Sequence, residues 1–351
     1  MLKLYTEIND LNTIKRKYLV DLLKPLLPEK NFDKYDIKNV ELILVTDKDE
    51  ADYFVLPFSW NFYIDKNNYS GAMALIKKAV KYNKKILIWV TGDYYYSLPK
   101  DSHIIGLYLS PYLSKQDMSI ISLPSIIKDP LHKLELGQIN LRELKGVPSI
   151  GFCGQADTNK FITLLKIFKL ASQNIGYHTN LFKWYSGPII PPTYLRKIAL
   201  DILDKRNDIH TQFIRRNRYQ GGVAKNSKAF QKLRKEFYNN INSTDYTLCI
   251  RGTGNFSTRF YEALALGRIP IFVNTDCILP FSGIIDWKKH VVWIEQREIS
   301  EIITKILDFH NGLTQDSFIS LQIKNRKLWE EYFSFPGFIK NLISHLIKRI
   351  D

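Results

Sequence analysis

Short apolar runs alternate with helical periodicity through the first half of the chain. Runs at Leu42–Thr46, Tyr53–Pro57, Ile86–Val90 and Ile104–Tyr108 have the length of buried strands. Between the second and third runs, residues Gly71–Val80 repeat apolar positions at helical spacing. Strands that alternate with helices predict a mainly parallel sheet that helices cover on both faces.

The same pattern begins again after a polar stretch. This stretch is Lys133–Val147. Pro148 follows it, and we place the domain boundary between these two residues. A strand at Ser149–Gly154 then leads through a polar turn into a helix expected at Asn159–Ala171. The predicted domains are therefore 1–147 and 148–323, followed at 324–351 by a helix that we expect to cross back to the first domain.

One β–loop–α–β pattern in the second half indicates a ligand site. Tyr246–Ile250 is predicted to be a buried strand, and Arg251–Asn255 is a loop with two glycines that lets backbone N–H groups approach a ligand. Ser257 suits the N-cap of the following helix, and a second strand at Ile269–Val273 follows that helix. This pattern points the N-terminus of a helix out of the carboxyl edge of a parallel sheet, where open α/β folds bind ligands.

The side chains of this segment favour a nucleotide. Free N–H groups and the positive end of the helix dipole attract an anion such as a diphosphate. Arg251 and Arg259 add full positive charges, and Glu262 suits the hydroxyls of a ribose diol. We therefore predict a nucleotide site formed by Arg251, Gly254, Ser257, Arg259 and Glu262. The alternative is a structural unit in which Arg259 and Glu262 pair with each other on the surface.

The overall charge also calls for anionic partners. The chain has 50 Lys and Arg against 35 Asp and Glu, a net charge of +15 over 351 residues. Ten basic residues and one acid lie between Lys205 and Lys235. Within this run, Arg215 and Arg216 directly follow an apolar pair, as if a strand ended there. We expect one of them to face phosphates and the other solvent, and the alternative is a solvated helix face.

A larger set of residues in the second half has a specific order and spacing. Its members are Cys249-Ile250-Arg251-Gly252, Gly254, Ser257, Arg259, Glu262-Ala263-Leu264, Gly267, Ile269-Pro270, Leu279-Pro280-Phe281, Asp286-Trp287 and Val291–Glu295. Upstream, Ala51–Pro57 adds a shorter match. Together these segments resemble the signature of the exostosin family of glycosyltransferases. Ile250 replaces the usual proline before the arginine, which should alter the stiffness of the loop more than its chemistry.

The resemblance implies a GT-B fold, in which two Rossmann-like domains face each other across a cleft. It implies inverting transfer from a nucleotide sugar, with a UDP sugar as the family-level expectation and a glycan or lipid-linked oligosaccharide as acceptor. Arg251, Ser257, Arg259 and Glu262 would line the donor nucleotide. The asparagine-arginine motif with a downstream histidine, found in eukaryotic members, is missing. This departure favours a bacterial or viral polysaccharide enzyme.

An inverting transfer needs a base that deprotonates the acceptor hydroxyl. Asp93 is our leading candidate because it follows the strand Ile86–Val90, and Gly92 frees the backbone there. The alternative for Asp93 is a carboxylate that caps the next turn. Glu7 and Asp10, after the first short strand, are further candidates.

Aromatic side chains after strands suit an acceptor sugar. Trp60 and Tyr94 lie in such loops, and we predict that they bind the acceptor, with ordinary packing as the alternative. No promising loop has the D-x-D spacing of a metal-dependent transferase. We therefore predict no metal and no cofactor, with Arg215, Arg216, Arg251 and Arg259 stabilising the diphosphate instead.

The remaining features bear on location. Cys153, Cys249 and Cys277 each lie in or beside apolar runs, so we interpret them as buried small side chains in a reducing cytoplasm. The first residues show no signal-peptide pattern, and no apolar stretch approaches the length of a membrane span. We expect a cytoplasmic protein, with peripheral contact at the inner face of an anionic membrane where lipid-linked acceptors reside.

Two other functions compete with this prediction. A binding protein of the same fold would hold a nucleotide sugar without a general base. A nucleic-acid-binding protein would account for the charge, but the sequence has no RRM, KH, zinc-finger or helix-turn-helix signature, and aromatics are not interleaved with the basic run. We therefore expect no nucleic-acid partner.

Overall fold

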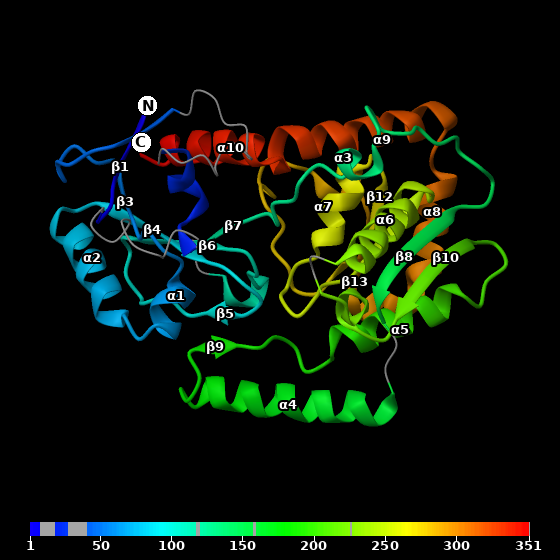
Figure 1. Ribbon diagram of the computed structural model, residues 1–351, viewed down its shortest axis with the longest axis horizontal. Coiled ribbons are helices and arrows are strands. Elements are labelled where there is room, and N and C mark those ends of the chain that lie inside the picture. Colours follow the sequence, from blue (N-terminus) through cyan, green and yellow to red (C-terminus); the bar gives the residue numbers. More distant parts are fainter. Residues whose placement is uncertain (8–17, 27–40, 117–119, 157–158, 225–226, 351) are drawn as a thin grey trace.

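The protein consists of two parallel α/β units joined side by side (Figure 1). The computed structural model describes residues 1–7, 18–26, 41–116, 120–156, 159–224 and 227–350. Each unit has one main sheet, and a third, two-stranded sheet joins the units at one side. Short 3₁₀ helices lie at Asp21–Leu26, Leu113–Lys115, Tyr219–Gly222, Trp287–Lys289 and Gln296–Glu301.

The first sheet has the strand order β2-β1-β3-β4-β6-β7, and all its neighbouring strands are parallel. Its strands are β1 (Leu2–Tyr5), β2 (Leu42–Leu44), β3 (Tyr53–Val55), β4 (Lys85–Val90), β6 (Ile104–Tyr108) and β7 (Ile120–Ser122). Each of the four strands expected in this half is present, and β1 and β7 complete the sheet. Two helices follow β3: α1 (Trp60–Asp65) and α2 (Tyr69–Lys81). Helix α2 buries Ala72, Leu75, Ile76 and Ala79, as the apolar spacing predicts.

The second sheet has the order β10-β8-β11-β12-β13 and is also parallel throughout. Its strands are β8 (Ser149–Gln155), β10 (His210–Arg216), β11 (Tyr246–Cys249), β12 (Ile269–Asn274) and β13 (Val292–Glu295). The winding reverses between β8 and β11, so the topological switch point lies between these two strands. The flanking helices are α3 (Leu131–Leu134), α5 (Pro192–Leu203), α6 (Lys228–Asn242), α7 (Thr258–Ala265) and α8 (Ile302–Asn311).

The C-terminal segment returns to the first unit. It comprises α9 (Gln315–Leu328), a π-helical turn at Trp329–Phe333 and α10 (Phe335–Ile347). Phe338, Leu342 and Leu346 of α10 belong to the core of the first unit, where Tyr53 donates from its hydroxyl to the carbonyl of Leu346 at 2.9 Å. The boundary expected at 323 is wrong in one respect: it falls inside α9, which continues to Leu328.

A helical arm leaves the second unit between β8 and β10. It consists of α4 (Lys160–His178) and the short strand β9 (Trp184–Tyr185), which pairs antiparallel with β5 (Tyr95–Tyr96) of the first unit. Asn159 caps α4 by accepting from the Phe161 N–H at 2.8 Å, and the helix is longer than the sequence predicted. In Figure 1 the arm runs along the bottom of the molecule, beneath both units.

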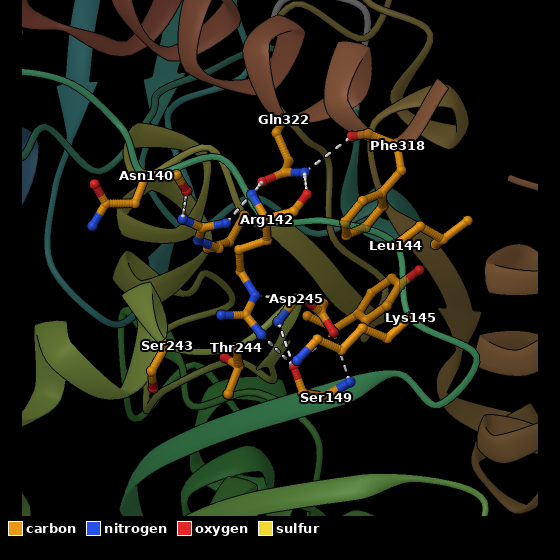
Figure 2. Close-up of polar contacts among 12 residues, drawn as sticks. Asn140, Arg142, Leu144, Lys145, Ser149, Ser243, Thr244, Asp245, Phe318 and Gln322 are labelled. Carbon is orange, nitrogen blue, oxygen red and sulfur yellow. Dashed lines mark hydrogen bonds and ion pairs between the residues drawn. The ribbon is translucent and has the colours of Figure 1, made fainter. Parts of the chain in front are cut away.

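The linker between the units is fixed at the amino edge of the second sheet (Figure 2). Arg142 donates to Asp245 at 2.5 Å, and the N–H and hydroxyl of Ser149 donate to the same carboxylate at 2.8 and 2.7 Å. Gln322 of α9 accepts from the Arg142 N–H and from Arg268, both at 2.9 Å. The opposite, carboxyl edge of the sheet is therefore the one left for a ligand.

These features confirm the predicted fold class. Two Rossmann-like α/β domains, with a C-terminal helix that returns to the first, form the GT-B type of architecture. Alternating strands and helices force each sheet to be parallel, because a parallel connection needs a crossover that the helix supplies.

Candidate functional site

Arg259 occupies the switch point of the second sheet. From the first turn of α7 its guanidinium donates to the carbonyls of Cys153 at 2.8 Å and Leu248 at 3.2 Å, which lie near the carboxyl ends of β8 and β11. The guanidinium stacks on the ring of Phe152, 4.4 Å from its centroid. Gly154 makes this position available, because a Cβ there would lie 2.6 Å from the Arg259 Nη2.

Arg251 lies where the two domains meet. Its guanidinium donates to the carbonyls of Thr253 at 3.2 Å and Ile190 at 3.4 Å. Gly187 adjoins it with a φ of +94°, and a Cβ at that position would come within 2.6 Å of the Tyr112 hydroxyl and 3.3 Å of the Arg251 Nη1. Tyr112 belongs to the first domain, so groups from both domains surround this arginine.

These two arginines are buried charges without a counter-ion. Arg251 is 5% exposed and Arg259 is 8% exposed, and desolvation lowers the pKa of each guanidinium from its usual value. Among the described residues, no carboxylate lies within ion-pair distance of either one. Carbonyl oxygens supply only partial charge to each guanidinium, so the arrangement favours an added anion such as a phosphate.

Glu262 has a different partner from the one weighed from the sequence. It is buried and accepts from Arg234 at 2.7 Å and from the Tyr238 hydroxyl at 3.3 Å. A surface pair of Arg259 with Glu262 is therefore wrong. Arg234, on α6, escaped the sequence analysis because it was one of many basic residues in its segment. The sequence feature that could have identified Arg234 is the pair of aromatic residues that follows it, Phe237 and Tyr238. In the structure the Arg234 guanidinium lies over both rings.

Arg215 and Arg216 both pair with carboxylates, so neither is left for phosphates, while Arg215 is exposed to solvent as expected for one of the two. Arg215 pairs with Asp201 at 2.6 Å and with Asp204, both on or next to α5. Arg216 pairs with Glu236 of α6 at 2.5 Å. The physical reason is that successive side chains of the edge strand β10 point to opposite faces, and a helix with carboxylates covers each face.

The glycine loop after β11 is fastened to the first domain. A Cβ at Gly254 would lie 2.6 Å from the Ser110 hydroxyl, so this close approach needs glycine. Asn255 is fully buried and donates to the carbonyl of Pro111 at 2.9 Å. Ser257 occupies the N-cap position of α7, but its side chain makes no capping hydrogen bond. Asn255 carried no signal in the sequence, because its partners, Pro111 in the first domain and Thr275 and Asp276 in the second, are distant from it along the chain.

The comparisons with known proteins agree with this geometry. Residues 191–308 match the sequence model of the Exostosin GT47 domain. This segment of the chain is thus similar to the exostosin GT47 domain. The resemblance found in the sequence is thereby confirmed, and every predicted donor-site residue lies inside the matched segment.

Individual relatives match this chain over short stretches. The chain is 33% identical over 101 residues to Exostosin-1a of Danio rerio, which is 29% of this chain and 13% of that protein. It is 30% identical over 93 residues to Exostosin-1 of Drosophila melanogaster, which is 26% of this chain and 12% of that protein. The chain thus spans about an eighth of the length of these relatives. The solved catalytic domain of starch synthase IV from Arabidopsis thaliana, bound to ADP and acarbose, is similar in structure. The match covers 86% of this chain and 73% of that chain, with 12% sequence identity and a TM-score of 0.35.

Asp93 lies outside the exostosin match, in the loop after β4. Its side chain is exposed, and the preceding Gly92 has a φ of +85°. The carbonyl of Gly92 accepts from the Ser110 hydroxyl at 3.0 Å, and Ser110 in turn adjoins Gly254. The loop of Asp93 is therefore next to the glycine loop of the exostosin domain, and its catalytic role stays a prediction. Glu7 pairs with Lys78 at 2.5 Å, whereas Asp10 lies outside the described residues.

The two aromatic residues expected to bind the acceptor have other contacts. Trp60 begins α1 and is 2% exposed in the first core, so direct stacking on a sugar is wrong for this residue. Tyr94 stacks on Trp184 of β9, with ring centroids 4.4 Å apart, and so helps to hold the arm. A cavity of about 980 Å³ lies nearby, with walls that include Thr91, Ser125 and His132. Across the described ranges, no group of three or more His, Cys, Asp and Glu side chains is placed to hold a metal ion.

Proposed function

We propose that this protein is a glycosyltransferase that moves a sugar from a nucleotide sugar, a UDP sugar in our expectation, to a hydroxyl group. The acceptor in this proposal is a glycan or a lipid-linked oligosaccharide, and transfer inverts the anomeric centre without a metal. One observation carries the proposal: Arg251 and Arg259 are buried at the carboxyl edge of the exostosin domain with no carboxylate in ion-pair range among the described residues. A diphosphate would supply the missing negative charge.

The leaving diphosphate gains charge as the glycosidic bond to the sugar breaks. Preorganised cations stabilise such a charge, and in a water-poor site they do so far more strongly than in bulk water. Arg251 is the nearer of the two to the first domain, so we assign it to the phosphates. Arg259 holds the ends of β8 and β11 together through its hydrogen bonds. In this proposal its positive charge also stabilises the diphosphate. Arg234 fixes Glu262 close to the nucleotide diol.

The base in this proposal is Asp93. Its carboxylate takes the proton of the acceptor hydroxyl as the oxygen attacks the anomeric carbon from the side opposite the diphosphate. The hydrogen bond from Ser110 to the carbonyl of Gly92 positions the loop, and the contact of Ser110 with Gly254 sets its distance from the donor. The cavity beside Thr91 offers space for the acceptor, since about 300–1,000 Å³ is usual for ligand sites.

Thermal unfolding against UDP, GDP, CMP and ADP tests the donor site. A nucleotide at one hundred times its dissociation constant should stabilise the wild type by about 2.7 kcal/mol. Arg251→Ala should lose this response, whereas Arg206→Ala should keep it, because Arg206 is an exposed arginine that pairs with Asp208. Absence of any nucleotide response, together with a shift caused by polynucleotide, would favour the nucleic-acid alternative instead.

Asp93→Asn separates a transferase from a non-catalytic binding protein. We expect this variant to keep the nucleotide response of the wild type. We also expect it to lose release of nucleoside diphosphate from the matching nucleotide sugar. If the wild type binds the nucleotide sugar and releases none in the presence of any polysaccharide or lipid-linked acceptor, the binding-protein alternative holds.

The location in this proposal is the cytoplasm, with peripheral contact at the inner face of a membrane. The support is the net charge of +15, which attracts anionic lipids. No nucleic-acid partner is included, because Arg215 and Arg216 of the basic segment pair with carboxylates on or next to α5 and α6.

A further inference from the structure

Helix α4 turns its apolar side away from the protein. Phe161 is 67% exposed, Phe168 is 65% exposed and Ile175 is 65% exposed. Ile162, Leu164 and Leu165 are about half exposed, each between 48% and 53%. Positions 161, 164, 165, 168 and 175 share one side of an α-helix, and Ile162 borders this side next to Leu165, three residues further on. We call these six residues the outer face of α4.

The polar side of the same helix faces the protein. Asn174 donates to the carbonyl of Gly187 at 2.8 Å and accepts from the Ser186 hydroxyl at 2.7 Å. The hydroxyl of Tyr177 lies 2.8 Å from that of Ser97 in the first domain. This orientation is the reverse of that of α2, which buries its apolar side against the sheet.

No core of the protein uses the outer face. Within the described residues, none of the four hydrophobic clusters includes a residue of α4. Figure 1 shows the helix along the outer edge of the molecule, below the two domains. Six large apolar side chains on one exposed helix form a patch of the kind that marks a binding surface, because scattered single residues are the rule elsewhere on a soluble protein.

The surrounding charge indicates what covers this face. Residues 159–200 contain no Asp or Glu, and the exposed Lys160, Lys169 and Lys183 lie on or close to the helix. A helix with large apolar residues on one side and lysines beside them is typical of segments that lie in the interface of an anionic bilayer. A second copy of the chain would bring the same lysines against each other, so charge disfavours a dimer through this face.

We propose that the outer face of α4 inserts into the surface of an anionic lipid bilayer, with Lys160, Lys169 and Lys183 contacting the headgroups. The helix would lie in the plane of the interface. None of the helices in the described part of the chain is long and apolar enough to cross a membrane.

This docking places the domain junction close to the membrane. The arm joins the first domain through the pairing of β9 with β5, and Ile190 at its far end contacts Arg251 of the exostosin domain. A lipid-linked acceptor would then reach the junction without leaving the bilayer. That last step rests on the proposed function, whereas the docking itself does not.

Vesicle flotation with the full chain tests the docking. Wild type should float with vesicles of equal parts phosphatidylcholine and phosphatidylglycerol and bind pure phosphatidylcholine weakly. The double variant Phe161→Ser, Phe168→Ser should lose about tenfold in binding per phenylalanine. The double variant Lys160→Gln, Lys169→Gln should lose about fivefold per lysine, and only with the anionic vesicles. Ile284→Ser, a matched change of an apolar side chain that is 63% exposed elsewhere, should bind like wild type.

Three controls make the outcome decisive. The unfolding midpoint and nucleotide response of each variant show that it is folded, and loss of the nucleotide response in every protein would count against the proposed function alone. Equal flotation of wild type and the Phe161→Ser, Phe168→Ser variant, or no flotation at all, would overturn the docking. Analytical ultracentrifugation decides the remaining case: a wild-type dimer that this variant dissociates would make the face a dimer interface.

Discussion

Arginines lie at both edges of the second sheet, and their hydrogen-bond partners differ. At the amino edge, Arg142 pairs with Asp245 at 2.5 Å, and Arg268 donates to the side chain of Gln322 at 2.9 Å (Figure 2). The strands, the linker and α9 together supply these partners. This edge is closed by groups of the chain itself, and the linker is fixed there as a result.

At the carboxyl edge, the acceptors that the described residues offer Arg251 and Arg259 are main-chain carbonyls. Desolvation lowers the pKa of both guanidinium groups there, as it does for Arg268 at the amino edge, so the two edges differ in hydrogen-bond partners and not in desolvation. An uncompensated buried charge is costly, and a protein keeps one where something else provides the compensation. The difference is that side-chain oxygens accept from the arginines at the amino edge, whereas main-chain carbonyls do so at the carboxyl edge, where we propose an anion site.

The largest expected effect is at the amino edge. Asp245→Ala removes the buried carboxylate that Arg142 and Ser149 share, so the partly buried Arg142 loses its ion pair and the buried N–H and hydroxyl of Ser149 lose their acceptor. We expect a loss of about 3–5 kcal/mol in the free energy of unfolding, measured by denaturant titration. The control Asp308→Ala, at an exposed position on α8, should change stability by less than about 0.5 kcal/mol. A small effect of Asp245→Ala would remove the contrast between the two edges.

A medium effect is expected from Gly154→Ala. The added Cβ would lie 2.6 Å from the Arg259 Nη2, so the guanidinium must move from the carbonyls that it holds. We expect a loss of about 1–3 kcal/mol in stability together with a weaker thermal response to the nucleotide. In the control Gly137→Ala the new Cβ meets nothing within 4 Å. An unchanged nucleotide response in Gly154→Ala would show that the position of Arg259 does not matter for the donor.

The smallest effect on stability, and the sharpest on binding, is expected from Arg251→Lys. Lysine keeps the charge but loses the forked geometry that fits phosphate oxygens, so stability should change by less than about 1 kcal/mol while nucleotide affinity falls about tenfold. Arg142→Lys, the same change at the amino edge, should leave the affinity unchanged. Isothermal titration calorimetry measures the nucleotide affinity of the two variants. Equal losses of affinity would contradict a distinct role for the carboxyl edge.

Local patterns predicted much of the fold. The apolar runs of β3, β4, β6, β8, β11 and β12 have only one stable environment, the interior of a parallel sheet, so their sequence suffices to place them. The residue pattern after β11 likewise predicted the glycine loop and the start of the helix that follows it. The fixed spacing of Arg251, Ser257, Arg259 and Glu262 was enough to find the exostosin segment.

Partners distant in the sequence were not predictable. Arg215 and Arg216 stood out as phosphate ligands because nothing near them in the chain is acidic except Asp208, yet α5 and α6 bring three carboxylates to them. Trp60 follows a strand like a loop residue, but α1 begins at this position and turns the ring into the core. Each case depends on packing between elements, which spacing along the chain does not encode.

Helix α4 shows the same division most clearly. The sequence predicted a helix here, after a strand and a polar turn. Only the tertiary structure decided which side faces the protein, because hydrogen bonds of Asn174 and Tyr177 hold the polar side inward. The sequence alone therefore determined the elements, the two-domain class and the family segment. Which charges are paired and which apolar surface is left exposed were decided by contacts between distant segments, since only folding brings these groups together.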